Sequence, residues 1–455
     1  MREKRHKQMP LTPAFREDFD QARELWAIGA ILDQHPAIYE AAYQDLCELG
    51  PETKNTGATG MSAEQVLRAA IVKALFGHSY RQLAFHIADS ACLRAFCRVR
   101  IGHDFKKSAL QMNIKTLSAE TWERINRVII GHATAKKIEK GREVRVDCTV
   151  VESNIHHPTD STLLWDAVRV LTRLLAAARD LGVAGLGFQD HGRRARRRML
   201  GIHNAKRHEA RKKLYADLLK MTELTVGYAE KALPYVDAYA PDSLEDMLEQ
   251  ARIFDGIQHY LPLARRVIDQ ARRRVLQGEN IPAAEKLLSI FETHTDIIIK
   301  DRRETHFGHK ICLTGGRSNL ILDCVVLRSN PADSELALPM LLRQKEIYGR
   351  APLKAALDGG FASKENVVLA KGTGVKDVCF AKRRGIKVSD MCRSKYVYRR
   401  LRNFRAGIES GISWLKRCFG LSRCNWQGWR SFQSYVWASV VSANLLTLAR
   451  AGTGK

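Results

Sequence analysis

The spacing of hydrophobic positions changes several times along this chain. From Met61 to Val99 apolar residues recur at intervals of three and four, which predicts helices. Residues 144–151 form instead a short run of β-formers, Val-Arg-Val-Asp-Cys-Thr-Val-Val. Helical spacing returns from residue 163 to 292, and after His309 short apolar runs alternate with helical stretches.

The last part of the chain is predicted to form an α/β layer structure, because strands and helices alternate there. Strands are expected at 310–313, 320–327, 353–358 and 377–381, and helices at 335–348 and 363–371. A lone strand at 144–151 would be unstable, so it must join the same sheet. Residues 152–305 are therefore interpreted as an insertion, with helices expected at 163–181, 204–239, 243–276 and 282–292.

The amino-terminal region is predicted to be all-helical. Ser62 can cap a helix, with Gln65 three residues later completing a capping box. Two short helices, 79–87 and 91–99, flank a break at Asp89-Ser90, which fits a helix-turn-helix. Tyr80 and Arg81 are then candidate DNA contacts, although a plain helical bundle explains the same pattern.

The charge of the chain favours a polyanionic partner. Lys and Arg number 74 against 49 Asp and Glu, a formal net charge of +25. Residues 193–213 contain a dense basic block with Glu209 as its only acid, so Arg194 and Arg197 are candidate phosphate contacts. A solvated or flexible basic face is the alternative reading of this block.

A membrane partner and a cysteine-based framework are not indicated. The longest uncharged stretch, 432–449, contains several Ser, Asn, Gln and Thr residues and is a better buried helix than a bilayer span. Basic residues near Met1 are not followed by an apolar segment. None of the ten cysteines forms a Cys-x-x-Cys pair, which argues against a zinc ribbon or a disulfide framework and suits a reducing cytosol.

Three acids stand where a metal site would need them. Asp147 lies among valines in the first strand, where an unpaired acid would be costly. Asp358 ends a strand before two glycines, and ligands of open α/β sheets collect at such ends. Glu409 shares a helix face with Arg405 and Lys416, since the spacings are four and seven residues.

Each acid also has an ordinary structural explanation. Asp147 could form a salt bridge to Arg145 or to a neighbour, and Asp358 could be a turn residue in an Asp-Gly dipeptide. Glu409 could form an exposed i,i+4 pair with Arg405. Against these explanations, three carboxylates in a basic protein suit two Mg²⁺ ions roughly 3.5–4 Å apart that act on a phosphodiester. Arg405 and Lys416 would then hold phosphates beside the metals.

From about residue 60 to 449 the chain resembles bacterial insertion-sequence transposases of the DDE group, especially those of the ISNCY type. The segments that carry the resemblance are 146–154, Phe307-Gly308-His309-Lys310, Asn330-Pro331-Ala332-Asp333-Ser334, Leu357-Asp358-Gly359-Gly360-Phe361 and Arg405 to Lys416. The Arg-x3-Glu-x6-Lys spacing matches the carboxyl-terminal signature of the group. That signature usually starts with a tyrosine where this chain has Arg402, and Tyr398 one helical turn earlier is a candidate replacement.

The resemblance implies a function and a division of the chain. Asp147, Asp358 and Glu409 would be both catalytic and metal-binding, with Mg²⁺ as the cofactor and Mn²⁺ as a substitute. Residues 140–151 and 306–449 would form an RNase H-like catalytic domain with a mixed sheet, interrupted by the helical insertion 152–305. Residues 1–135 would bind the terminal inverted repeats of the element.

A transposase of this kind would cleave double-stranded DNA and join it to a target. It would act in the cytoplasm on the nucleoid, and coordinated cutting of two ends implies a homodimer or larger assembly on DNA. Two alternatives stay open: a transposase-derived regulator that binds DNA without catalysis, and an RNase H-like nuclease that cleaves without joining. Other polar and aromatic residues are weaker candidates. His156 and His157 could approach the site or be solvated, and His309 is interpreted as structural. The tryptophans are interpreted as core residues rather than base-stacking residues: 414, 426, 429 and 437.

Overall fold

The computed structural model describes residues 4, 19–48, 60–100, 102–300 and 304–452. The chain divides into two compact units, residues 1–153 with 308–455, and residues 154–307. The predicted amino-terminal region therefore lies in the same unit as the sheet, although its residues 1–3, 5–18 and 49–59 fall outside the described part. The predicted domain boundaries remain predictions. Within the described ranges, no helix is both long and apolar enough to cross a membrane.

The amino-terminal part of the first unit is helical, as the periodicity predicts. Its helices are α1 (Asp20–Asp33), α2 (Ala37–Glu48), α3 (Ala63–Phe76), α4 (Tyr80–Asp89), α5 (Ala91–Phe96), α6 (Lys107–Thr116) and α7 (Ala119–Ala135). The predicted capping box starts α3: Gln65 N donates to Ser62 Oγ at 3.2 Å, and Ser62 N donates to Gln65 Oε1 at 3.0 Å. Helix α5 ends three residues earlier than expected, and the positive φ of Arg98 (55°) prevents its continuation.

One mixed sheet forms the centre of the α/β part. Its strands are β1 (Glu143–Glu152), β2 (Asp296–Lys300), β3 (Glu304–Gly315), β4 (Ile321–Val326), β5 (Lys354–Leu357) and β6 (Asp377–Phe380). The order is β2-β3-β1-β5-β6, with β4 also paired to β3. Strand β1 runs antiparallel to β3 and parallel to β5. The first strand therefore joins the later ones as predicted, and the α/β class is confirmed, with a mixed sheet consistent with an RNase H-like domain.

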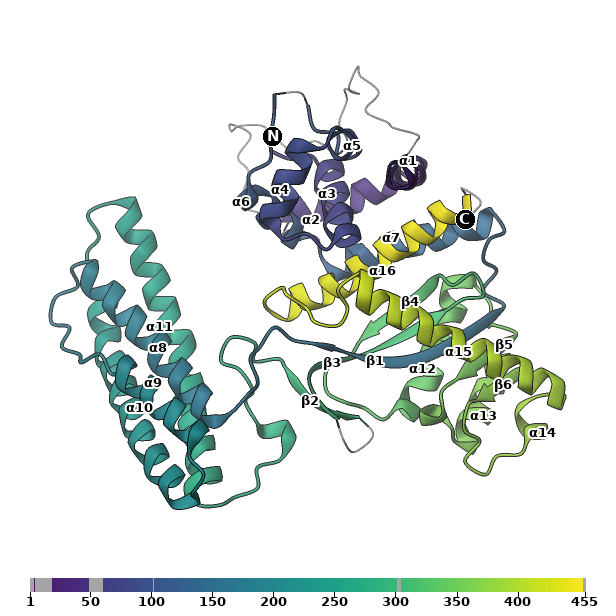
Figure 1. Ribbon diagram of the computed structural model, residues 1–455. Helices are drawn as coiled ribbons and strands as arrows, with labels where there is room; N and C mark the ends of the chain where they lie inside the picture. The colour runs from purple at the N-terminus through teal and green to yellow at the C-terminus, as the bar shows by residue number, and fades with distance from the viewer. Residues whose placement is uncertain (1–3, 5–18, 49–59, 101, 301–303, 453–455) are drawn as a thin grey trace. The chain divides into compact units, whose positions relative to one another are not determined.

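Helices pack on this sheet and carry much of the later sequence. They are α12 (Asp333–Tyr348), α13 (Lys364–Gly372), α14 (Val388–Met391), α15 (Lys395–Cys418) and α16 (Trp429–Gly452). Figure 1 shows α15 lying along β1 and β5. Buried Arg145 of β1 fixes this contact, because its Nη1 donates to Phe404 O of α15 at 3.1 Å. A Cβ on Gly407 would lie 1.9 Å from that Nη1, so only glycine permits so close an approach.

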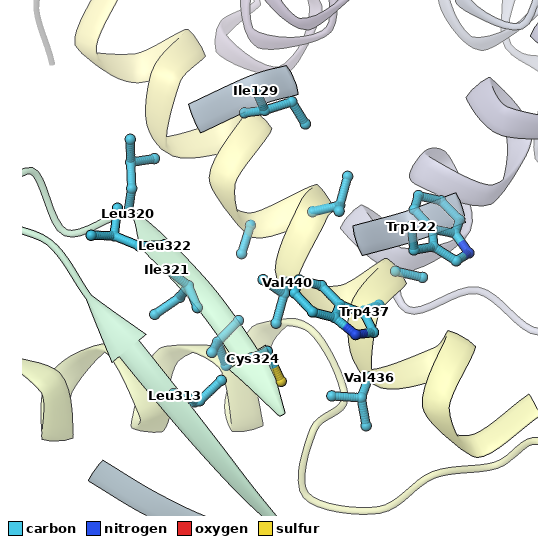
Figure 2. Packing of buried hydrophobic residues seen from close by; sticks show 14 of the residues in the cluster. Trp122, Ile129, Leu313, Leu320, Ile321, Leu322, Cys324, Val436, Trp437 and Val440 are labelled. Atoms are coloured by element: carbon cyan, nitrogen blue, oxygen red, sulfur yellow. The ribbon is translucent and has the colours of Figure 1, made fainter. Parts of the chain in front are cut away.

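Helices α7 and α16 form a second layer against β3 and β4. Figure 2 shows Trp122 and Ile129 of α7 and Trp437 and Val440 of α16 packed with apolar residues of these strands. A buried polar contact fixes the register of the layer. Asn444 Oδ1 accepts from Ile321 N at 2.8 Å, and Asn444 Nδ2 donates to Asn126 Oδ1 at 2.8 Å.

The second unit is a helical bundle of α8 (Asp160–Asp180), α9 (Gly192–Asn204), α10 (His208–Asp237) and α11 (Leu244–Ala271), which continues as a π-helix over Arg272–Leu276. The predicted helix 282–292 was wrong, since only a 3₁₀ turn, Ala283–Glu285, forms there. Side-chain hydrogen bonds replace helical ones: Leu287 N donates to Gln270 Oε1 at 2.7 Å, and Ser289 Oγ accepts from Phe291 N at 3.1 Å.

Two elements inside the predicted insertion were missed. Helix α9 contains the basic block and buries only Ala195 and Ile202, too few apolar residues to give a helical period. Strand β2 lies within a stretch interpreted as helical, although Ile297-Ile298-Ile299 is a short β-branched run.

Asn444→Leu should destabilise the first unit by about 2–4 kcal/mol, because it leaves Ile321 N and Asn126 without their buried partner. Thermal or urea unfolding of the full chain measures this change. Ser442 is a suitable control, since its buried hydroxyl has no hydrogen-bond partner in the described structure and Ser442→Ala should be near neutral. Equal unfolding midpoints for Asn444→Leu and the wild type would contradict the proposed role of this contact.

Candidate active site

The three acids selected from the sequence meet at one guanidinium, that of Arg405. Arg405 Nη2 lies 2.8 Å from Asp147 Oδ2 and 2.9 Å from Asp358 Oδ1. Arg405 Nη1 lies 2.5 Å from Glu409 Oε1. Carboxylates that are 211 residues apart in the chain, Asp147 and Asp358, thus approach the same nitrogen atom.

Each of the three acids lies at a different kind of structural element. Asp147 is in the middle of β1, two residues after Arg145, so the two side chains point to the same face of the sheet, toward α15. Asp358 directly follows β5, at the carboxyl end of a parallel strand. Glu409 lies one helical turn after Arg405 on α15. The site is therefore built where a strand centre, a strand end and a helix face converge.

The ion pairs of Asp147 and Glu409 agree with the structural alternatives given to these two acids, so their catalytic roles stay predictions. Arg145 donates to Phe404 O and to Asn319 Oδ1 at 2.6 Å, whereas Asp147 pairs with Arg405. The Arg405–Glu409 pair expected on the helix surface is present, but only Glu409 is largely exposed (60%), whereas Arg405 is at 14%. This guanidinium is thus a half-buried link among three carboxylates rather than an isolated surface partner.

The two glycines after Asp358 provide room rather than an unusual backbone. Neither Gly359 nor Gly360 has a positive φ. A Cβ on Gly359 would lie 2.7 Å from Lys382 Cβ, and a Cβ on Gly360 would lie 2.6 Å from Asp333 Oδ2. The Asp-Gly-Gly segment is therefore packed between the end of β6 and the start of α12, which restricts where Asp358 can lie.

Asp333 is itself held in place by Lys310. Lys310 Nζ lies 3.0 Å from Asp333 Oδ1 and donates to Pro331 O at 2.6 Å. Lys310 lies opposite Val150 in the β1–β3 pairing, so this contact joins the central strands to α12. Both residues lie in segments that carry the resemblance, but two separated polar residues gave no local signal that they would pair.

A basic segment beside Asp358 was also missed. Lys382, Arg383 and Arg384 follow β6 directly, are exposed, and have no ion pair within the ranges that the structure describes. Their proximity to the acids follows from the parallel pairing of β5 with β6, which places both strand ends at one edge. The sequence signal was a short run of cations after a predicted strand.

The donor set fits a divalent magnesium-like ion. Three carboxylates and one guanidinium leave the cluster with an excess of negative charge, and carboxylate oxygens are the hard ligands that Mg²⁺ prefers. As placed, no three Asp, Glu, His or Cys side chains among the described residues are grouped closely enough to hold a metal ion. The guanidinium lies between the carboxylates, so metal binding would require it to move aside.

The predicted DNA contacts are distributed unevenly. Arg405 belongs to the carboxylate cluster, and Lys416 is partly buried further along the same helix. Arg194 pairs with Asp217 at 2.5 Å, whereas Arg197 is exposed without an ion pair in the described structure. Arg81 is exposed, but the Tyr80 hydroxyl is buried and the Tyr80 ring faces Lys73 Nζ at 4.9 Å.

The remaining candidates lie outside the cluster. Arg402 is exposed, and the Tyr398 hydroxyl donates to Phe380 O at 3.0 Å, so Tyr398 does not stand in beside the carboxylates. His156 lies 3.4 Å from Asp166 in the helical unit, where the ring of His157 contacts Phe307. His309 is fully buried against the rings of Trp429 and Phe432, in keeping with its structural interpretation.

Gly360→Ala should destabilise the chain by about 1–3 kcal/mol, because the added methyl group would collide with Asp333. Gly372→Ala is the matched control, since its Cβ would meet nothing within 4 Å. Thermal unfolding of both variants checks this, and an unchanged midpoint for Gly360→Ala would show that the Asp-Gly-Gly segment is not tightly packed.

Comparison with known proteins gives one match. Residues 289–445 match the family model described as "Transposase DDE domain". The matched range contains Asp358, Arg405 and Glu409 but not Asp147, which the structure adds through the pairing of β1 with β3 and β5. No curated protein and no solved structure matches the chain. The ISNCY type remains a prediction, and the family match shows that residues 289–445 are similar to the DDE domain of transposases.

Proposed function

We propose that this protein is a DNA transposase that binds the terminal inverted repeats of its element, cleaves DNA there and joins the ends to a target. The observation that carries the proposal is the convergence of Asp147, Asp358 and Glu409 on Arg405. The family match supports transposase function over residues 289–445, and the metal, the reaction steps and the residue roles are proposed here.

The proposed reaction has two phosphoryl transfers. In the first, a water oxygen attacks the phosphorus at the end of the element; the bond from phosphorus to the 3′-oxygen breaks, and that oxygen leaves as a 3′-hydroxyl. In the second, this hydroxyl attacks a target phosphodiester in line, loses its proton and displaces another 3′-oxygen. Both steps require charge stabilisation and positioning more than covalent chemistry by the protein.

The three carboxylates would hold divalent metal, with Mg²⁺ as the proposed ion. Bound there, such ions neutralise charge on the attacking and leaving oxygens. Asp147 lies on a strand at the centre of the sheet, which suits a ligand whose position must be fixed. Glu409, exposed on its helix, can adjust as substrate enters.

Arg405 would change partners during this cycle. Without metal its guanidinium balances part of the charge of three acids. Once displaced, the same fork of N–H donors suits a phosphate oxygen pair of the DNA. Lys416 on the same helix and the exposed cations 382–384 would extend this phosphate-binding surface.

Asp147→Asn, Asp358→Asn and Glu409→Gln should each lower the rate of Mg²⁺-dependent cleavage at the element ends by at least about a hundredfold. Loss of a ligand should cost more than loss of a residue that only orients one. Asp390→Asn is the control, because Asp390 is an exposed acid on another helix and should keep wild-type activity. The substrates are duplexes taken from the DNA that flanks the gene, and wild-type rates in the three site variants would refute the assignment.

The same substrates separate the alternative functions. A pre-nicked end with a free 3′-hydroxyl should be joined to target DNA by a transposase, whereas a nuclease of this fold would cleave without giving joined products. DNA binding without Mg²⁺-dependent products from the wild type would support a regulator instead.

Arg405→Met should increase the rise in melting temperature produced by Mg²⁺, because the guanidinium no longer competes for Asp147 and Asp358. A gain of about 1 kcal/mol corresponds to roughly 1 °C in a chain of 455 residues. Arg399→Met, an exposed position on the same helix, should respond to Mg²⁺ as the wild type does. An Arg405→Met response equal to that of the wild type would contradict competition between guanidinium and metal.

A further inference from the structure

A buried lysine without a carboxylate partner lines a pocket in the first unit. Lys73 of α3 is 8% exposed, and within the described residues its ammonium group has no hydrogen bond or ion pair. Its contacts are with aromatic rings: Nζ lies 4.9 Å from the Tyr80 ring centroid and 5.8 Å from that of Trp426. A cation on so buried a residue, with no carboxylate beside it in the pocket, is costly, so its retention calls for an explanation.

The pocket itself has a volume of about 290 Å³ and no acidic lining residue. Besides Lys73 it is lined by Arg423, Ser422, Asn425 and Trp426 of the segment that follows α15. The Trp426 indole N–H is a second buried donor with no acceptor in the described structure. A buried lysine, an indole N–H without an acceptor in the described structure and a lining without a carboxylate suit an anionic ligand.

Loss of a proton does not remove the charge of Lys73 at neutral pH. Burial, followed by the smaller repulsion from Lys115, lowers the pKa of Lys73 to about 8, and Cys424 acts in the opposite direction. Below pH 8 the group is therefore mainly a cation, held in an aromatic setting that leaves its N–H donors unused.

The pocket is linked by backbone hydrogen bonds to the strand that bears Asp147. Glu152 N donates to Ser422 O at 3.1 Å, and Cys424 N donates to Glu152 O at 2.8 Å. Glu152 lies five residues beyond Asp147 on β1, a separation of about 17 Å along an extended strand. Since successive phosphates of one DNA strand rise by about 3.4 Å, this span corresponds to roughly five nucleotides.

We propose that the pocket around Lys73 is a phosphate-binding subsite, and that its ligand is a backbone phosphate of the DNA held at the three carboxylates. Lys73 supplies the charge, Trp426 and the rim residues Ser422 and Asn425 supply further donors, and Arg423 attracts the strand from solvent. Phosphate binding stands on the pocket alone, whereas its assignment to DNA rests on the proposed function.

The test measures DNA binding by the full chain in EDTA, so that no cleavage is involved. Fluorescence anisotropy of a labelled duplex is recorded over a series of NaCl concentrations for wild type, Lys73→Met and Lys73→Arg. Lys73→Met should weaken binding about tenfold at low salt and lower the slope of log K against log salt by roughly 0.9. Lys73→Arg should restore most of the affinity and most of the salt slope. Lys371→Met removes a charge from an exposed position of α13 and should leave the slope within error of wild type.

Thermal unfolding tests whether Lys73 binds a ligand or stabilises the fold. Lys73→Met replaces a buried cation with an apolar side chain of similar length, so its melting temperature should equal or exceed that of wild type. A lower melting temperature together with weaker DNA binding would make Lys73 a structural residue and overturn the proposal. An unchanged salt slope in Lys73→Met would also overturn it.

Inorganic phosphate tests whether the ligand of the pocket is a backbone phosphate of DNA or free phosphate. Sodium phosphate, compared with NaCl at matched ionic strength, should stabilise the wild type slightly and Lys73→Met not at all. If it does so while the DNA slopes of the two proteins coincide, the pocket binds free phosphate and its assignment to DNA fails. An inactive wild type that shows the predicted slopes would defeat the proposed reaction and leave this subsite standing.

Discussion

The α/β half of this protein depends on one electrostatic constraint, the sharing of a single guanidinium by three carboxylates. Carboxylates brought this close repel one another, and a cation among them offsets that repulsion. Arg405 supplies that cation from α15 and so joins the middle of β1, the end of β5 and its own helix. One positive charge for three negative ones is an incomplete balance, which favours the binding of further cations.

Close packing is what allows this arrangement. Gly407 lets Arg145 reach under α15, and Gly359 and Gly360 let the segment after β5 lie between Lys382 and Asp333. None of these glycines is required by a left-handed backbone; each is required by a neighbouring atom that leaves no room for a Cβ. The carboxylates are therefore positioned by close packing around these glycines and by the charge of Arg405 on α15.

The sequence predicted the strands and the helix that bear the three acids better than it predicted the contacts among their side chains. The valine run around Asp147, the strand before Asp358 and the helical spacing of Glu409 are local patterns, and all three elements formed as expected. That Arg405 would turn toward the acids depends on how α15 crosses β1, which no local pattern encodes. Helix α9 was missed because it buries too few apolar residues to show a helical period, and in 282–292 the bond from Leu287 N to Gln270 Oε1 joins residues that no local pattern relates. Strand β2 was missed although its β-branched run is a local signal.

Net charge predicts a polyanionic partner without showing where that partner binds. Many cations of this chain are already balanced in the structure: Arg194 and Arg198 share Asp217, Arg343 pairs with Asp323, and buried Arg68 pairs with Glu64. Such residues raise the formal charge of +25 but cannot bind phosphate without giving up a partner. The informative cations are those that the described structure leaves without a carboxylate, such as Lys73 beneath the aromatic rings and Lys382 beside Asp358. Lys382 packs against Gly359 beside Asp358, and the segment that lines the Lys73 pocket is bonded to the end of the strand that bears Asp147, so each cation is joined to an element of the site.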